Sequence, residues 1–148
     1  MNIFQALRQD HDKQRQLLEA LLETSGDTEE RVHIFLALKD ELISHAVAEE
    51  RAFYKPLIMD DMTQEKSRHA IAEHHEIDEL IEALEAEDRS SPAWLSTAKK
   101  LQAKVLHHLD DEEQEFFQVA GRVLEDKEKS ALADEFLEEK RDHMDVES

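Results

Sequence analysis

The sequence contains no cysteine among its 148 residues. Disulfide bonds, thiolate zinc sites and cysteine-ligated iron–sulfur clusters are therefore excluded. Glycine and proline are scarce, with two of each, so few positions interrupt a helix. No apolar run is long enough to cross a membrane, and the first residues lack the apolar core of a signal peptide. A helical, cytoplasmic protein is expected.

Positive charge is also in short supply, because 37 acidic residues face 18 basic ones and the net charge is −19. A surface this acidic repels phosphate groups, so neither nucleic acid nor an anionic membrane is an expected partner. The length suits one domain with a sizeable core.

Apolar residues recur at helical spacing through most of the chain. The expected helices span residues 3–24, 28–59, 64–87, 91–124 and, more briefly, 127–142. Pro56 is expected to bend the last turn of the second helix. Residues 141–148 are expected to fray.

A ten-residue motif occurs twice, 63 residues apart. It reads H-x3-E-E-x2-F-aromatic at His45–Tyr54 and at His108–Phe117. Histidine and the first glutamate are four residues apart, so they share one face of a helix. Polar groups on an otherwise apolar face are costly unless a partner compensates them, and a metal ion is such a partner.

The repeat extends well beyond this motif. Shifting the chain by 63 residues places His11 on His74 and Thr28 on Ser91. The chain is therefore interpreted as two αα-hairpins. The predicted fold is all-α: an antiparallel up-down-up-down four-helix bundle over residues 1–124, followed by a short C-terminal helix and tail over residues 125–148.

Six side chains are predicted to meet in one layer of this core. They are His11, His45, Glu49, His74, His108 and Glu112. Imidazoles with carboxylates suit iron, manganese or zinc better than magnesium or calcium. Two carboxylates related by a twofold axis can each bridge two metal ions. With a shared oxo or hydroxo group, each octahedral ion keeps an open position for a small molecule such as O₂, NO or peroxide.

On these residues the chain resembles the hemerythrin-like proteins of the HHE cation-binding group. The residues that carry the resemblance are His11-Asp12, His45-x3-Glu49-Glu50, Glu73-His74 and His108-x3-Glu112-Glu113. The resemblance covers about residues 4–124. It implies a left-handed bundle with a non-haem, oxygen-bridged di-iron centre held by the six residues above, with Glu49 and Glu112 bridging.

One histidine of the oxygen-carrying hemerythrins is absent. They have a further histidine one turn from the ligand of their third helix, whereas the positions four before and four after His74 are Ala70 and Asp78. This departure favours sensing, NO or peroxide chemistry, or iron handling over reversible O₂ carriage. Whether the chain is an enzyme stays open, and any signal must pass to a redox or signalling partner protein.

The remaining polar residues have simpler interpretations. Five histidines lie off the apolar faces or in the tail and are expected to be ordinary: His33, His69, His75, His107 and His143. Of these, His75 and His107 adjoin ligands and could support them. Glu50 and Glu113 point about 100° away from the ligand face and are expected at the surface. Phe53 and Phe116 are expected in the core, and Tyr54 at an interface.

Four other functions compete with di-iron chemistry at O₂, NO or peroxide. An iron-handling or iron-sensing protein would use the same centre without turnover. A ferritin-like oxidase needs two Glu-x2-His pairs, and only Glu30-x2-His33 fits. A phosphotransfer bundle needs one exposed histidine, and a purely structural bundle would be stabilised by replacing His45 and Glu49 with leucine.

Overall fold

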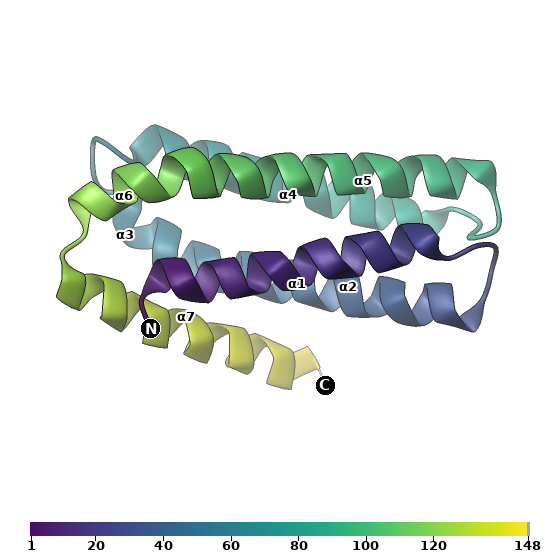
Figure 1. Ribbon diagram of the computed structural model, residues 1–148, viewed down its shortest axis with the longest axis horizontal. Coiled ribbons are helices and arrows are strands. Elements are labelled where there is room, and N and C mark those ends of the chain that lie inside the picture. The colour runs from purple at the N-terminus through teal and green to yellow at the C-terminus, as the bar shows by residue number, and fades with distance from the viewer. Residues whose placement is uncertain (148) are drawn as a thin grey trace.

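The computed structural model describes the backbone of residues 1–147 and the side chains of residues 1–144. Within this range every regular element is helical (Figure 1). The elements in order are α1 (Ile3–Glu23), α2 (Glu29–Glu49), η1 (Glu50–Tyr54), α3 (Lys55–Leu57), α4 (Gln64–Ala86), α5 (Pro92–Asp111), η2 (Glu112–Phe116), α6 (Phe117–Val123) and α7 (Asp126–Glu147). In the described part of the chain, no helix has the length and apolarity needed to cross a membrane.

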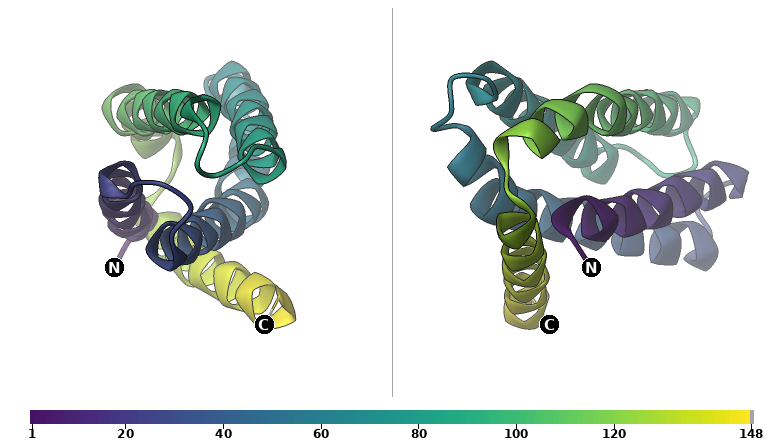
Figure 2. Two further views of the ribbon diagram at one scale, coloured as in Figure 1. Left: turned by 90° about the vertical axis from the view of Figure 1, so that its right-hand side faces the viewer. Right: turned by 60° about the vertical axis from the view of Figure 1, so that its left-hand side comes forward.

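Four helical rods form the predicted antiparallel bundle. They are α1, α2 with its continuation η1 and α3, α4, and α5 with its continuation η2 and α6. Seen end-on in Figure 2, the rods occupy the four corners of the bundle and α7 lies outside them. The predicted helix limits agree with the observed ones to within about two residues. The all-α bundle is confirmed.

Local capping fixes where the rods begin. Asn2 and Gln5 form a reciprocal capping box at the start of α1. The side chains of Thr28 and Ser91, which are equivalent in the repeat, accept hydrogen bonds from the backbone of Arg31 and Trp94. The same chemistry therefore starts the second helix of each hairpin.

The irregularity expected at Pro56 has a different position and cause. A five-residue π-helix, η1, precedes the proline, and a second π-helix, η2, interrupts the fourth rod where the sequence has no proline. The first π-helix begins directly after Glu49, and the second begins at Glu112, so both lie at the first glutamate of the repeated motif. Such π-turns inside α-helices often mark functional sites.

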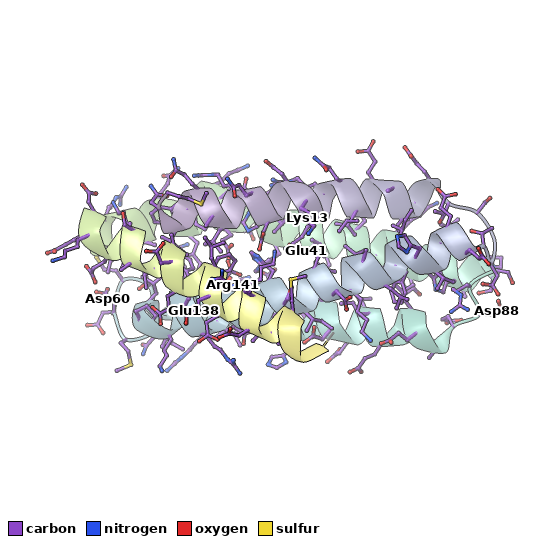
Figure 3. The ribbon with its side chains drawn as sticks, turned by 90° about the horizontal axis from the view of Figure 1, so that it is seen from below. Lys13, Glu41, Asp60, Asp88, Glu138 and Arg141 are labelled. Atoms are coloured by element: carbon purple, nitrogen blue, oxygen red, sulfur yellow. The ribbon has the colours of Figure 1, made fainter. Side chains whose placement is uncertain are left out.

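The last helix is longer than predicted. α7 continues through Glu147 instead of ending near residue 142. The fraying expected for residues 141–148 is therefore wrong for residues 141–147, and Ser148 lies outside the described residues. Seen from below in Figure 3, α7 crosses over α1 and α2. Its Ala133 and Phe136 are buried, and this packing explains why the helix persists.

Two apolar clusters fill the core at opposite ends of the bundle. One lies toward the loops 24–28 and 87–91 and includes Leu38, Trp94 and Leu101. The other lies toward α7 and includes Leu7, Phe53 and Phe136. The six polar residues singled out by the sequence lie between these clusters and are buried.

Candidate metal centre

The structure brings all six predicted site residues together. His11, on α1, and His74, on α4, face the second helix of each hairpin, which carries His45 with Glu49 and His108 with Glu112. All six side chains are at most 5% exposed. This burial places four imidazoles and two carboxylates in one layer between the apolar clusters.

The groups divide into two potential metal positions. Ligand atoms of His11, His45, Glu49 and Glu112 lie within 4.8 Å of one another. Those of Glu49, His74 and His108 form a second group by the same measure. Each hairpin thus supplies the histidine pair of one position, and Glu49 belongs to both.

The distances show that the carboxylates lie among the imidazoles. His11 Nε2 is 3.1 Å from Glu112 Oε1, and His74 Nε2 is 3.2 Å from Glu49 Oε1. The corresponding i,i+4 distances are 3.5 Å for His45 to Glu49 and 3.9 Å for His108 to Glu112.

Several atoms facing this layer have no hydrogen-bond partner. They are the Nε2 atoms of His11, His45 and His108, Glu49 Oε2 and Glu112 Oε1. Buried polar atoms are ordinarily satisfied, so a group of them converging on one place indicates a missing ligand. Nitrogen and oxygen donors in this arrangement fit first-row transition metal ions.

Each imidazole is oriented by a carboxylate on its other nitrogen. The Nδ1 atoms of His45 and His108 contact Asp10 at 2.9 Å and Glu73 at 3.0 Å. Those of His11 and His74 contact Glu113 at 2.6 Å and Glu50 at 3.0 Å. A proton on Nδ1 leaves Nε2 free to face a metal, and such outer partners fix the ring orientation.

The expectation that Glu50 and Glu113 are surface groups is therefore wrong. Their side chains are 35% and 20% exposed, and their carboxylates reach back over the rim to the histidines of the facing hairpin. The repeat held a signal for this network, because Asp10 falls on Glu73 and Glu50 falls on Glu113 after a shift of 63. An acidic residue occupies every matched position.

Tyr54 is a further residue of this layer that sequence reasoning missed. It is fully buried, its hydroxyl lies 2.7 Å from Glu49 Oε1, and it also contacts Glu112 Oε2. In a regular α-helix Tyr54 would point well away from Glu49, since five residues correspond to about 500° of rotation. The π-turn η1 winds more residues into a turn and brings position i+5 onto the ligand face.

The two core carboxylates differ in their affinity for protons. Burial raises the pKa of Glu49, but the charge of His45 together with hydrogen bonds to Glu112, His45 and His74 outweighs it and leaves that pKa well below its usual range. Burial and the charge of Glu49 together raise the pKa of Glu112. Tyr54 can then donate its proton to Glu49 and accept one from protonated Glu112, which holds the two carboxyl groups together.

The surrounding histidines hold protons when no metal is bound. Burial lowers the pKa of His45, but Glu49 and Asp10 reverse this and raise it to about 10. Burial also lowers the pKa of His74, but hydrogen bonds to Glu49 and Glu50 outweigh burial and raise this pKa to about 9. A metal ion binding here must displace these protons.

Of the histidines expected to be ordinary, His69 and His107 are exposed on α4 and α5 near the layer. His69 Nε2 is 3.5 Å from Glu73, and His107 Nε2 is 3.1 Å from Asp111. His33 and His75 are exposed. Phe53 and Phe116 are buried with ring centroids 5.4 Å apart, as predicted.

Comparison with known proteins agrees with this architecture. The model of the hemerythrin HHE cation-binding domain matches residues 2–120. The crystal structure of a hemerythrin HHE cation-binding domain-containing protein from Mycobacterium kansasii superposes with a TM-score of 0.87. That match covers 97% of this chain and 87% of the other at 22% identity, so it shows a shared fold.

A curated relative is longer. A protein of Nostoc sp. named DNA nickase is 27% identical over 136 residues. The match covers 92% of this chain but 38% of the Nostoc protein. The chain therefore spans well under half of that relative.

Proposed function

The chain belongs to the hemerythrin HHE cation-binding domain family, and from this premise we propose that it is a non-haem di-iron protein. Two iron ions would be held by His11 with His45 and by His74 with His108, and Glu49 and Glu112 would be shared between them. The observation that carries the proposal is the pair of buried donor groups with Glu49 common to both. The inward-facing atoms without partners support it.

Iron is the metal that we favour. Four imidazoles and two carboxylates also accept manganese or zinc. The resemblance of the repeated motif to the hemerythrin-like proteins, however, implies iron. When bound, an iron pair supplies the electrons and open coordination positions needed to bind or react with O₂, NO or peroxide.

The chain's own residues would control that chemistry. The carboxylates on the four Nδ1 atoms would hold the imidazoles in place. Phe53 and Phe116 would keep water from the layer. Tyr54 places a hydroxyl proton between Glu49 and Glu112, where it can be given to or taken from a group bound at the centre.

We favour reaction or sensing over reversible O₂ carriage. Ala70 and Asp78 occupy the positions where a fifth histidine would lie, and Ala70 is buried. Without that ligand neither iron would be saturated by protein groups. Iron handling or sensing without turnover is the second candidate, favoured by the same open coordination.

We further propose a cytoplasmic setting in which the partners are small molecules and a redox or signalling protein. The net charge of −19 opposes binding to a phosphate backbone. DNA cleavage is therefore not proposed for this chain on the strength of the name of its Nostoc relative.

The deciding experiment measures iron content and near-ultraviolet absorbance of protein purified in air, then after anaerobic reduction and exposure to NO or peroxide. Two irons per chain and a band that is lost on reduction are expected. A His45→Leu, Glu49→Leu variant should lose both, whereas a His33→Leu control should keep both. No band after iron reconstitution of the parent would overturn the proposal, and labile iron without turnover would favour the handling function.

A further inference from the structure

A pocket of about 340 Å³ opens on one side of the bundle, next to the second hairpin. Its lining includes His69, Glu73, His108, Asp111, Glu112 and Glu115. Residues from α4, α5 and η2 therefore form its walls. Two of the residues predicted as metal ligands, His108 and Glu112, belong to this lining.

Three residues at this pocket form a third donor cluster, outside the candidate metal layer. Ligand atoms of His69, Glu73 and Asp111 lie within 4.8 Å of one another. His69 is exposed and Asp111 is partly exposed, with 68% and 42% of their side chains accessible, whereas Glu73 is buried. The cluster thus reaches from solvent into the protein.

Buried atoms without partners lie further in. His108 Nε2 and Glu112 Oε1 are both inaccessible and have no hydrogen-bond partner. Glu73 connects the exposed donor cluster with the buried metal layer, because one of its oxygens lies 3.0 Å from His108 Nδ1 and 3.5 Å from His69 Nε2. The outer cluster and the candidate metal layer therefore share one wall of the same pocket.

The equivalent positions of the first hairpin are closed in the described part of the chain. The positions equivalent to His69, Asp111 and Glu115 are Ala6, Ala48 and Ala52. All three alanines are buried in one apolar cluster with Ala133 and Phe136 of α7. The last helix therefore covers this face of the first hairpin, and the matching face of the second hairpin carries donor side chains instead.

We propose that His69, Glu73 and Asp111 form a docking site that receives a hydrated divalent cation, Fe²⁺, and delivers it through the pocket to His108 and Glu112. The inference rests on the proposed di-iron function and names the route by which that centre is filled. In this proposal His69, for which the sequence predicted no functional role, is a ligand of the incoming cation.

The donor set suits a transient site. One imidazole and two carboxylates bind a first-row divalent ion, and the exposed side leaves room for its water ligands. Existing ion pairs would be exchanged when the cation binds, since His107 contacts Asp111 at 3.1 Å and Lys104 contacts Glu73 at 3.5 Å. Clusters of one charge sign at a pocket mouth accelerate capture of the opposite ion.

The test follows the growth of visible absorbance when Co²⁺ is mixed with metal-free full-length protein, together with the final metal content. The His69→Ala, Asp111→Asn variant should load on the order of tenfold more slowly but reach the same final content as the parent. His69→Asp, which retains a donor, should recover most of the rate. His33→Ala, Asp40→Asn removes the same side-chain types from exposed positions outside the pocket and should load like the parent.

Equal loading rates in the parent and the pocket variant would overturn the route, as would equal slowing by the control pair. Failure of the parent itself to take up Co²⁺ in the core would overturn the di-metal function and the route with it. Full final loading at a reduced rate in the pocket variant alone would support both.

Discussion

Each hairpin of the bundle carries the same three ligand-type residues, two histidines and one glutamate, but the two hairpins surround them differently. Position 54 is tyrosine in the first hairpin, and its equivalent, Phe117, stacks on His11 with ring centroids 5.9 Å apart. The outer face of the first hairpin is closed by α7, whereas that of the second opens into a pocket. A duplicated ligand set can therefore give two unequal metal positions, because the surroundings are not duplicated.

The supporting cations also differ between the hairpins. Lys140 of α7 contacts Asp10 at 2.7 Å and Glu41 at 2.8 Å. In the second hairpin Lys104, which occupies the position equivalent to Glu41, contacts Glu73 directly. The lysine that pairs with the supporting carboxylate therefore comes from α7 in the first hairpin and from the hairpin's own helix α5 in the second.

The largest expected effect separates Glu49 from Glu112. Glu49→Gln should lose metal from both positions, since Glu49 belongs to both donor groups, whereas Glu112→Gln should keep an ion at His74 and His108. The loss in affinity for Glu49→Gln should exceed the roughly 10- to 100-fold typical of outer partners. Elemental analysis after dialysis checks this, and equal losses in the two variants would show that the carboxylates bridge equivalently.

Next comes the pH dependence of the metal-free protein. Histidines with raised pKa values stabilise the fold below the unfolded value of 6.5, and this stability is lost as the pH rises through about 9 for His74 and about 10 for His45. Burial raises the pKa values of Glu73 and Glu113, but the hydrogen bonds and charges of His108, and of His11 with Arg15, together outweigh it and lower both pKa values to about 2. The contribution of these carboxylates is therefore present above pH 4.5 and is lost as the pH falls toward 2. Melting temperatures should therefore be highest between these windows, and a flat profile from pH 5.5 to 9.5 would contradict the histidine contribution.

Exchanging the two aromatic residues tests the tyrosine difference. Tyr54→Phe should destabilise the metal-free protein by about 1–3 kcal/mol, because Glu49 and Glu112 lose a buried hydrogen-bond partner. Phe117→Tyr is the matched control that adds a hydroxyl to the other hairpin. Urea unfolding measures both, and an unchanged midpoint for Tyr54→Phe would mean that water replaces the hydroxyl.

An effect of no more than similar size is expected from the lysines. Lys140→Met should cost about 1–3 kcal/mol, since Asp10 and Glu41 are buried or nearly so and lose a charged partner. Lys104→Met should cost less than about 1 kcal/mol, because Lys104 is 26% exposed and its contact with Glu73 is longer, at 3.5 Å. Thermal unfolding of the two variants gives the comparison, and a larger loss for Lys104→Met would reverse it.

A comparably small effect concerns the loops that precede the second helix of each hairpin. Gly26 has φ of +66°, whereas its equivalent is Arg89, and no non-glycine residue of the described chain has positive φ. Gly26→Ala should lower the free energy of unfolding by about 1 kcal/mol, because alanine is strained at positive φ. Backbone strain is the only cost expected, since the added Cβ would meet no neighbouring atom. Arg89→Ala is the control at the matched position, and an unchanged midpoint for Gly26→Ala would mean that the loop relaxes.

Much of this organisation could be read directly from the residues. Helical spacing, two glycines and two prolines indicated an all-α chain, and the 63-residue repeat indicated paired hairpins with His11, His45, Glu49 and their equivalents on inward faces. These features depend on local geometry, because residues four apart share a helix face in any fold. The resemblance to the hemerythrin-like family came from the same motif, and the match over residues 2–120 confirmed it.

Other features depended on contacts between segments far apart in the chain. Glu113 reaches His11 across 102 residues, and α7 covers Ala6 and Ala48 because alanines leave room for Phe136. Tyr54 was misplaced because a π-turn, invisible to a regular helical period, rotates it onto the ligand face. The sequence by itself determined which groups face the core. Only the tertiary structure decided which carboxylate holds which histidine and which side of the centre stays open, since both follow from packing of whole helices.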